Sequence, residues 1–217
     1  MKKKKTGAFF DLDDTILKGN SSVLWGFLMF RKGQLPFRFF FRAALYGGLY
    51  KLGLFPYDLA ITKVIATLKG QSSVKAVRLT KIFFEKNKIS MYRPRLLQQI
   101  GMHKGKKHEI VIITQTLDFI AKIFAKDLGI KHIISTEVET SKGKFTGNVK
   151  PCVGYRKDDL MWQISEKLNI DLKKSYAYTD SMRDLEMLEK VGHKFVVNPD
   201  ARLGVIAKRK GWNIWRI

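Results

Sequence analysis

The first residues whose types and spacing could do chemistry are Asp11 and Asp13, which directly follow the apolar run 8–10. In an extended or gently turning segment, side chains two residues apart point the same way, so both carboxylates can share one pocket. One carboxylate can then act as a nucleophile while the other donates and accepts a proton. A bound cation would offset their mutual repulsion. The pair predicts a reactive site at the end of a strand.

Three further polar sites stand after predicted strands or at the start of predicted helices, and the last of them contains two aspartates. Thr114 follows the apolar run 110–113, and its hydroxyl could donate a hydrogen bond to a phosphoryl oxygen. Lys157 begins a predicted helix, and its point charge is suited to neutralising a phosphoryl group. Asp180 follows a third apolar run, where its carboxylate could complete a magnesium site. Asp184 lies one helical turn further on, placed to orient its neighbours.

The elements that must position these groups are predicted by short apolar runs that alternate with amphipathic stretches. This alternation is typical of an α/β fold with a doubly wound, Rossmann-like parallel sheet, which binds ligands beyond the carboxyl ends of its strands. The predicted strands are 7–12, 110–113, 132–135, 176–178, 195–197 and 212–217. The predicted helices of this core are 117–128, 157–168 and 184–191.

Residues 18–105 have a different pattern, with longer helical segments separated by glycine and proline turn signals. The predicted helices of this stretch are 21–30, 37–50, 58–68 and 74–86. We therefore predict a helical cap at 18–105, inserted between residues 1–17 and 106–217 of the α/β core.

The order of the four polar groups, with a cap-sized gap between the first two, resembles the haloacid dehalogenase-like (HAD) hydrolase superfamily. The resemblance is to subfamily IB, the phosphoserine phosphatase-like branch, which has a helical cap of the C1 type after the first motif. The motifs that carry it are DLDDT at 11–15, IVIIT at 110–114, the GKFTGNV segment leading to Lys157, and YTDSMRD at 178–184. Together they span essentially the whole chain.

The resemblance implies a magnesium-dependent phosphomonoester hydrolase that works through an aspartyl-phosphate intermediate. Asp11 would be the nucleophile and Asp13 the general acid and base, while Thr114 and Lys157 hold the phosphate. Mg²⁺ would be bound by Asp11, the main-chain carbonyl of Asp13 and Asp180, with Asp184 in a supporting role. Candidate substrate contacts from the cap are Asn20, Ser21, Arg93 and Arg95.

Two features of the sequence depart from the family pattern. Thr179 stands where a glycine commonly precedes the aspartate of the fourth motif, and Gln115 stands where a small residue usually follows Thr114, so we expect a narrower pocket. In phosphoserine phosphatases, an acidic residue soon after the first motif resembles a residue that recognises the amine group of the substrate. Here no acidic residue occurs from 15 to 57. Phosphoserine is therefore a poor candidate substrate.

The distribution of charge predicts an anionic partner. The chain has a formal net charge of +22, and residues 15–108 carry 18 Lys and Arg against 2 acidic residues. Aromatic residues interleave with these basic ones, and we expect most of the aromatics to form the core of the cap. The others favour a surface at lipid headgroups or a groove for phosphorylated substrates. A small phosphorylated metabolite or a phosphorylated lipid fits this charge, and contact with an anionic membrane is left open.

Two alternative functions fit parts of the sequence. One is a phosphotransferase of the same fold, in which an alcohol accepts the phosphoryl group. The other is a catalytically idle basic module that binds nucleic acid or anionic membrane. Nucleic acid has little support, because no recognisable single-strand-binding motif is present.

The predicted location is cytoplasmic, with peripheral contact at the inner face of the membrane left open. The longest run without a charge is 12 residues, Gly19–Phe30, which is too short to span a bilayer. The single cysteine, Cys152, excludes an intramolecular disulfide and points to a reducing compartment.

Overall fold

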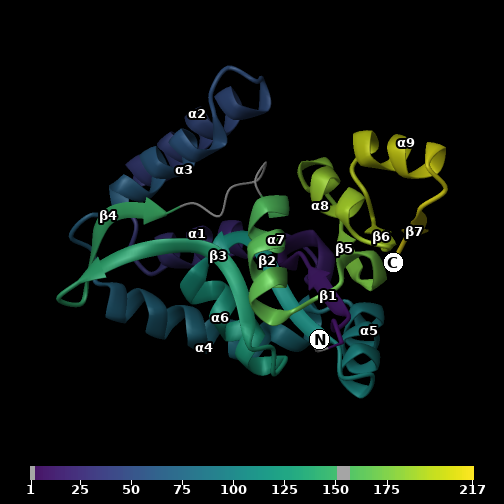
Figure 1. Ribbon diagram of the computed structural model, residues 1–217. Helices are drawn as coiled ribbons and strands as arrows, with labels where there is room; N and C mark the ends of the chain where they lie inside the picture. The colour runs from purple at the N-terminus through teal and green to yellow at the C-terminus, as the bar shows by residue number, and fades with distance from the viewer. Residues whose placement is uncertain (1–2, 151–156) are drawn as a thin grey trace.

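A seven-stranded sheet forms the centre of the computed structural model, which describes residues 3–150 and 157–217 (Figure 1). The strands are β1 (Gly7–Phe10), β2 (Glu109–Leu117), β3 (His132–Ser141), β4 (Lys144–Lys150), β5 (Tyr176–Thr179), β6 (His193–Val197) and β7 (Asn213–Trp215). Their order is β4-β3-β2-β1-β5-β6-β7, and only the β3–β4 pair is antiparallel. The predicted α/β class is confirmed. Cys152 lies outside the described residues.

Strand β1 is the middle of the sheet and determines where the site lies. All four of its residues are buried, as expected for a strand covered on both faces. Phe10 packs into one hydrophobic core with Ile112, and Phe9 packs into a second core with Val111 on the other face. Because β2 and β5 flank β1 in parallel, the carboxyl ends of all three strands meet at one edge of the sheet.

Nine α-helices lie in the described part of the chain. They are α1 (Ser21–Arg31), α2 (Phe37–Lys51), α3 (Tyr57–Ile65), α4 (Ser73–Met91), α5 (Pro94–Gly105), α6 (Asp118–Asp127), α7 (Lys157–Leu168), α8 (Leu185–Lys190) and α9 (Ala201–Arg209). Helices α2 and α3 pack side by side and extend beyond the sheet (Figure 1). Across the same described residues, no helix has both the length and the hydropathy needed to cross a membrane.

Helix α5 falls inside the predicted cap but packs against the sheet. Its Leu96, Ile100 and His103 are buried. The His103 ring contacts the edge of Phe10, and its Nε2 lies 3.0 Å from the hydroxyl of Tyr178 in β5. The division between core and cap at residue 105 stays a prediction, while this helix is physically part of the layer that covers the sheet.

The hairpin of β3 and β4 was not predicted. Strand β3 runs to Ser141, well past the predicted end at 135, and turns through Lys142 and Gly143, which both have positive φ as two-residue hairpin turns require. The hairpin binds the helical segment, because the amide of Gly70 donates to the Phe145 carbonyl at 2.9 Å. Helices α5 and α9 were also missed, and the predicted helix at 117 begins one residue later because β2 extends to Leu117.

Candidate active site

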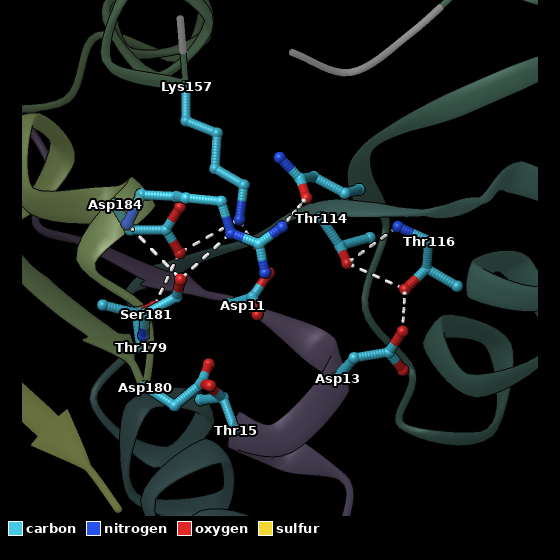
Figure 2. Close-up of polar contacts among 12 residues, drawn as sticks. Asp11, Asp13, Thr15, Thr114, Thr116, Lys157, Thr179, Asp180, Ser181 and Asp184 are labelled. Atoms are coloured by element: carbon cyan, nitrogen blue, oxygen red, sulfur yellow. Dashed lines mark hydrogen bonds and ion pairs between the residues drawn. The ribbon is translucent and has the colours of Figure 1, made fainter. Parts of the chain in front are cut away.

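Asp11, Lys157 and Asp184 form a buried ion-paired group at the edge of the sheet (Figure 2). The Lys157 ammonium donates to Asp11 Oδ1 at 2.8 Å and to Asp184 Oδ2 at 3.0 Å. Thr179, at the end of β5, also donates to Asp184 Oδ2, at 2.6 Å. Only 4% of the Lys157 surface and 1% of the Asp184 surface are exposed. The first residue of α7 is thereby fixed above the end of β1.

The segment after β1 separates the two carboxylates of the first motif. The Asp11 amide donates to the Tyr178 carbonyl at 3.0 Å, which continues the pairing of β1 with β5. Asp14 then adopts φ +56°, in the left-handed region that aspartate tolerates. Its amide donates to the Gly19 carbonyl at 3.2 Å and closes the turn. Asp11 therefore stays with the strand, while Asp13 faces the start of α1.

Asp13 is held by hydrogen bonds from both neighbouring elements. The amide of Ser21, the first residue of α1, donates to Asp13 Oδ1 at 2.9 Å. The hydroxyl of Thr116 donates to Asp13 Oδ2 at 2.8 Å and lies 3.0 Å from the hydroxyl of Thr114 (Figure 2). A chain of polar groups thus joins β2 to the segment after β1.

Asp180 lies on the other side of Asp11, directly after β5. The hydroxyl of Thr15 donates to Asp180 Oδ1 at 3.1 Å (Figure 2). The Asp180 carbonyl accepts from the amide of Asp200, and Asp200 Oδ2 accepts from the amide of Met182. The Asp180 carboxylate is therefore held by a residue of the first motif, and its main chain is held by the segment that precedes α9.

Burial dominates the electrostatics of the three carboxylates. It raises the pKa of Asp11 to about 6, although the nearby positive charge of Lys157 lowers it. Burial, with the negative charge of Asp11, raises the pKa of Asp180 to about 8. The pKa of Asp13 is also raised by burial, against the hydrogen bonds from Ser21 and Thr116. Crowded, desolvated carboxylates of this kind are stabilised by a cation.

The residues present fit a divalent cation that completes its shell with carbonyls and water. Within residues 3–150 and 157–217, no three His, Cys, Asp or Glu side chains form a metal-binding group by themselves. Mg²⁺ is commonly bound through one or two carboxylates and keeps several waters. Asp184 Oδ1 is buried without a hydrogen-bond partner in the described structure, so a polar ligand is still required near it.

A cavity of about 580 Å³ opens above these groups. Its base is formed by a set that we call the polar floor: Asp11, Asp13, Thr114, Thr116, Lys157, Asp180 and Asp184. Its sides are formed by a set from α1, α2 and α3 that we call the cap wall: Ser22, Val23, Trp25, Gly26, Phe27, Phe39, Phe40, Ala43, Ala44, Gly47, Tyr50, Tyr57, Ala60, Ile61, Val64 and Ile65. The six predicted residues of the α/β core are thus brought together at one cavity.

The four candidate substrate residues have different positions. Asn20 lines the cavity, and its side chain accepts from the amide of Val23 at 2.9 Å as the N-cap of α1. Ser21 contacts the site through its backbone amide, which donates to Asp13 Oδ1. Arg93 donates instead to the carbonyl of Ile217 at 2.6 Å, and the Arg95 guanidinium lies 3.9 Å from the Trp215 ring centroid. Neither arginine is among the described residues that line the cavity.

Three hydroxyl residues that hold the carboxylates were not predicted in this role from the sequence, namely Thr15, Thr116 and Thr179. Thr116 could have been found, because it lies two residues after Thr114 on one strand and so shares its face. Gln115, expected to narrow the pocket, accepts a hydrogen bond from Arg183 at 2.8 Å. This contact joins β2 to the segment after β5 at the side of the cavity.

Comparison with known proteins identifies the family. The model of the haloacid dehalogenase-like hydrolases matches residues 8–189, and the chain belongs to that family. Over 218 residues it is 28% identical to the phosphoserine phosphatase SerB1 of Mycobacterium tuberculosis (strain ATCC 25618 / H37Rv), covering 95% of this chain and 69% of that protein. The predicted resemblance to the phosphoserine phosphatase-like branch is confirmed.

Two further proteins are similar over nearly their whole length. A histidinol-phosphatase of Neisseria meningitidis serogroup C (strain 8013) is 29% identical over 224 residues, covering 97% of this chain and 98% of that protein. A solved structure of a protein of unknown function from Bordetella pertussis Tohama I has a TM-score of 0.87 at 24% identity, covering 99% of both chains. The family and its relatives support a phosphatase activity of the HAD type for this chain.

Proposed function

We propose that this enzyme is a magnesium-dependent phosphomonoester hydrolase that passes the phosphoryl group through Asp11. The observation that carries the proposal is the buried Asp11 carboxylate, held at 2.8 Å by Lys157 at the base of a cavity that also contains Asp13. A fixed carboxylate beside a second carboxylate with a raised pKa provides a nucleophile and a proton donor.

The reaction has two steps. In the first, an Asp11 oxygen bonds to phosphorus as the bond from phosphorus to the leaving oxygen breaks, and Asp13 gives that oxygen its proton. In the second, Asp13 takes a proton from a water molecule, which attacks phosphorus and breaks the bond to Asp11. Inorganic phosphate leaves, and both carboxylates return to their starting states.

The other residues of the polar floor would place hydrogen-bond donors and positive charge around the phosphoryl group. Thr114 and Lys157 would contact the phosphoryl oxygens, and Asp184 with Thr179 would hold the Lys157 ammonium in place. Asp11, the main-chain carbonyl of Asp13 and Asp180 would hold Mg²⁺. When bound, this ion would supply positive charge that offsets the negative charge of the carboxylates and the phosphoryl group.

Phosphate release from a broad panel of phosphomonoesters, with and without Mg²⁺, tests the proposal. Asp11→Asn removes the nucleophile with little change of shape, and Lys157 keeps its ion pair with Asp184. We expect this variant to lose at least about 10³-fold in kcat/KM, while Glu186→Gln, at an exposed position of α8, retains activity. Equal phosphate release by native enzyme and a folded Asp11→Asn variant would exclude Asp11 as the nucleophile.

The exposed side of α2 supports contact with an anionic membrane. Phe37 and Phe41 are exposed on one side of α2, beside the exposed Arg38 and Arg42. Basic side chains at lipid headgroups and aromatic side chains at the boundary are typical of interfacial helices. We propose that this surface meets anionic lipid.

Flotation with vesicles tests this contact. Anionic vesicles at low salt should carry the native protein upward, and a Phe37→Ser, Phe41→Ser variant should bind less. The control is Ile89→Ser, which removes a still more exposed apolar side chain from α4. Equal binding to neutral and anionic vesicles, or an equal loss in the control, would contradict the proposal.

A further inference from the structure

Among the described residues that line the cavity, those of the cap wall carry no charged side chain. Among the described residues that line it, every Asp, Lys and Arg belongs to the β1–α1 turn, to α7 or to the segment between β5 and α8. The lining residues from α1, α2 and α3 are aliphatic, aromatic or small, with Ser22 and the tyrosines 50 and 57 as the polar members. The two parts of one cavity therefore differ sharply in charge.

The residues of the cap wall recur along α2 and α3 at the spacing of one helix face. In α2 the lining positions are 39, 40, 43, 44, 47 and 50, and in α3 they are 57, 60, 61, 64 and 65. Steps of three and four residues place each set on one face of its helix. Ala43, Ala44 and Gly47 are small, so they leave the space between the helices that larger side chains would fill.

The chemistry of the cap wall selects among phosphate esters. Phosphoserine and histidinol phosphate each carry an ammonium group, which would meet no carboxylate on the cap wall. Burying such a charge without a partner is strongly unfavourable. An apolar chain gains from the same surroundings, and each methylene that it buries should improve kcat/KM by about two- to fourfold.

We infer that the substrate is a phosphate monoester of an apolar chain, whose tail lies between α1, α2 and α3 while its phosphate meets the polar floor. The inference rests on the proposed phosphomonoesterase function and adds the class of substrate. An n-alkyl, a prenyl or a monoacylglycerol phosphate has the required chemistry. A volume of about 580 Å³ lies in the range of sites that enclose ligands of this size.

The test is a series of n-alkyl phosphates from ethyl to decyl, with Mg²⁺, below their critical micelle concentrations. We expect kcat/KM to rise with chain length by about 10²-fold or more in total, then level off once the cavity is filled. The kcat/KM for phosphoserine and for histidinol phosphate should be lower than that for decyl phosphate. Prenyl and monoacylglycerol phosphates of matched carbon number then identify the kind of tail, and a gain with either supports the inference.

A pair of adjacent glycines in α2 supplies a matched control. Gly47 lines the cavity and Gly48 does not, and a Cβ added at either position meets nothing within 4 Å. Gly47→Leu should lower the ratio of kcat/KM for decyl over ethyl phosphate by at least about tenfold, whereas Gly48→Leu should leave that ratio unchanged. Melting temperatures establish that both variants fold.

The outcomes separate this inference from the proposed function. Magnesium-dependent hydrolysis with no dependence on chain length, or an equal effect of the two leucine variants, would overturn the inference and leave the function standing. No hydrolysis of any ester, including ethyl and nitrophenyl phosphate, would overturn both.

Discussion

The polar floor and the cap wall enclose the same cavity but are built in different ways. The polar floor comes from the last part of β2, the segments after β1 and β5 and the first residue of α7. Its side chains are fixed by ion pairs and hydrogen bonds such as Lys157 to Asp11. The cap wall comes from three successive helices and is shaped by the sizes of apolar side chains. In our account the polar floor determines the reaction and the cap wall determines which ester reaches it. Changes to the two regions should therefore have separable effects.

After the loss of Asp11, the largest effect is expected from Asp13. Asp13→Asn removes the proton donor, and we expect kcat for alkyl phosphates to fall by about 10²- to 10⁴-fold, by the same factor for short and long chains. A nitrophenyl ester should lose less in its first step, because nitrophenolate leaves without a proton. Steady-state and burst kinetics with both esters measure this difference. A loss that grows with chain length would contradict the separation of the two regions.

A smaller effect is expected from Thr116, whose hydroxyl donates to Asp13 at 2.8 Å. Thr116→Val keeps the shape of the side chain and removes the hydrogen bond, so kcat should fall by about tenfold for all esters. Thr146→Val is the control, because that hydroxyl bonds Glu139 at the surface of the hairpin. If Thr116→Val changed the preference for chain length and left kcat unchanged, Thr116 would act on substrate selection and not on catalysis, which would contradict the prediction.

The smallest effect is expected from adding a charge to the cap wall. Val23 lines the cavity and is 55% exposed, so Val23→Glu places a carboxylate there at little cost to folding. The ratio of kcat/KM for phosphoserine over decyl phosphate should rise by up to about fivefold, the strength of a partly exposed ion pair. An unchanged or lower ratio would show that the missing carboxylate is not what disfavours amino-acid phosphates.

The contrast between the two regions also explains what could be predicted from the sequence. Asp11 and Thr114 come directly after buried apolar runs and Asp180 comes directly after β5, and parallel strands bring such residues to one edge of the sheet. That local signal predicted the fold class and, with the charged residues at the starts of two predicted helices, six of the seven residues of the polar floor. Lys157 was predicted at the start of its helix, which is where α7 begins.

Predictions failed where contacts between distant segments decide the structure. Arg93 and Arg95 were proposed from charge alone, but they contact Ile217 and Trp215 at the other end of the chain. Strand β4 contains few apolar residues, and it forms because the turn at Gly143 returns it to β3. The inward face of α2 could not be chosen either, because aromatic residues occur on both its buried and exposed sides.

The central claim, that the phosphoryl group passes through Asp11, is tested most directly by trapping it. In Asp13→Asn the first step with nitrophenyl phosphate needs no proton donor, while the second step has lost the base that activates water. We predict a burst of nitrophenolate stoichiometric with the enzyme, and peptide mass spectrometry of the acid-quenched protein should locate the phosphoryl group on Asp11. A phosphoryl group on any other residue, or steady turnover with no burst and no labelled peptide, would contradict the account.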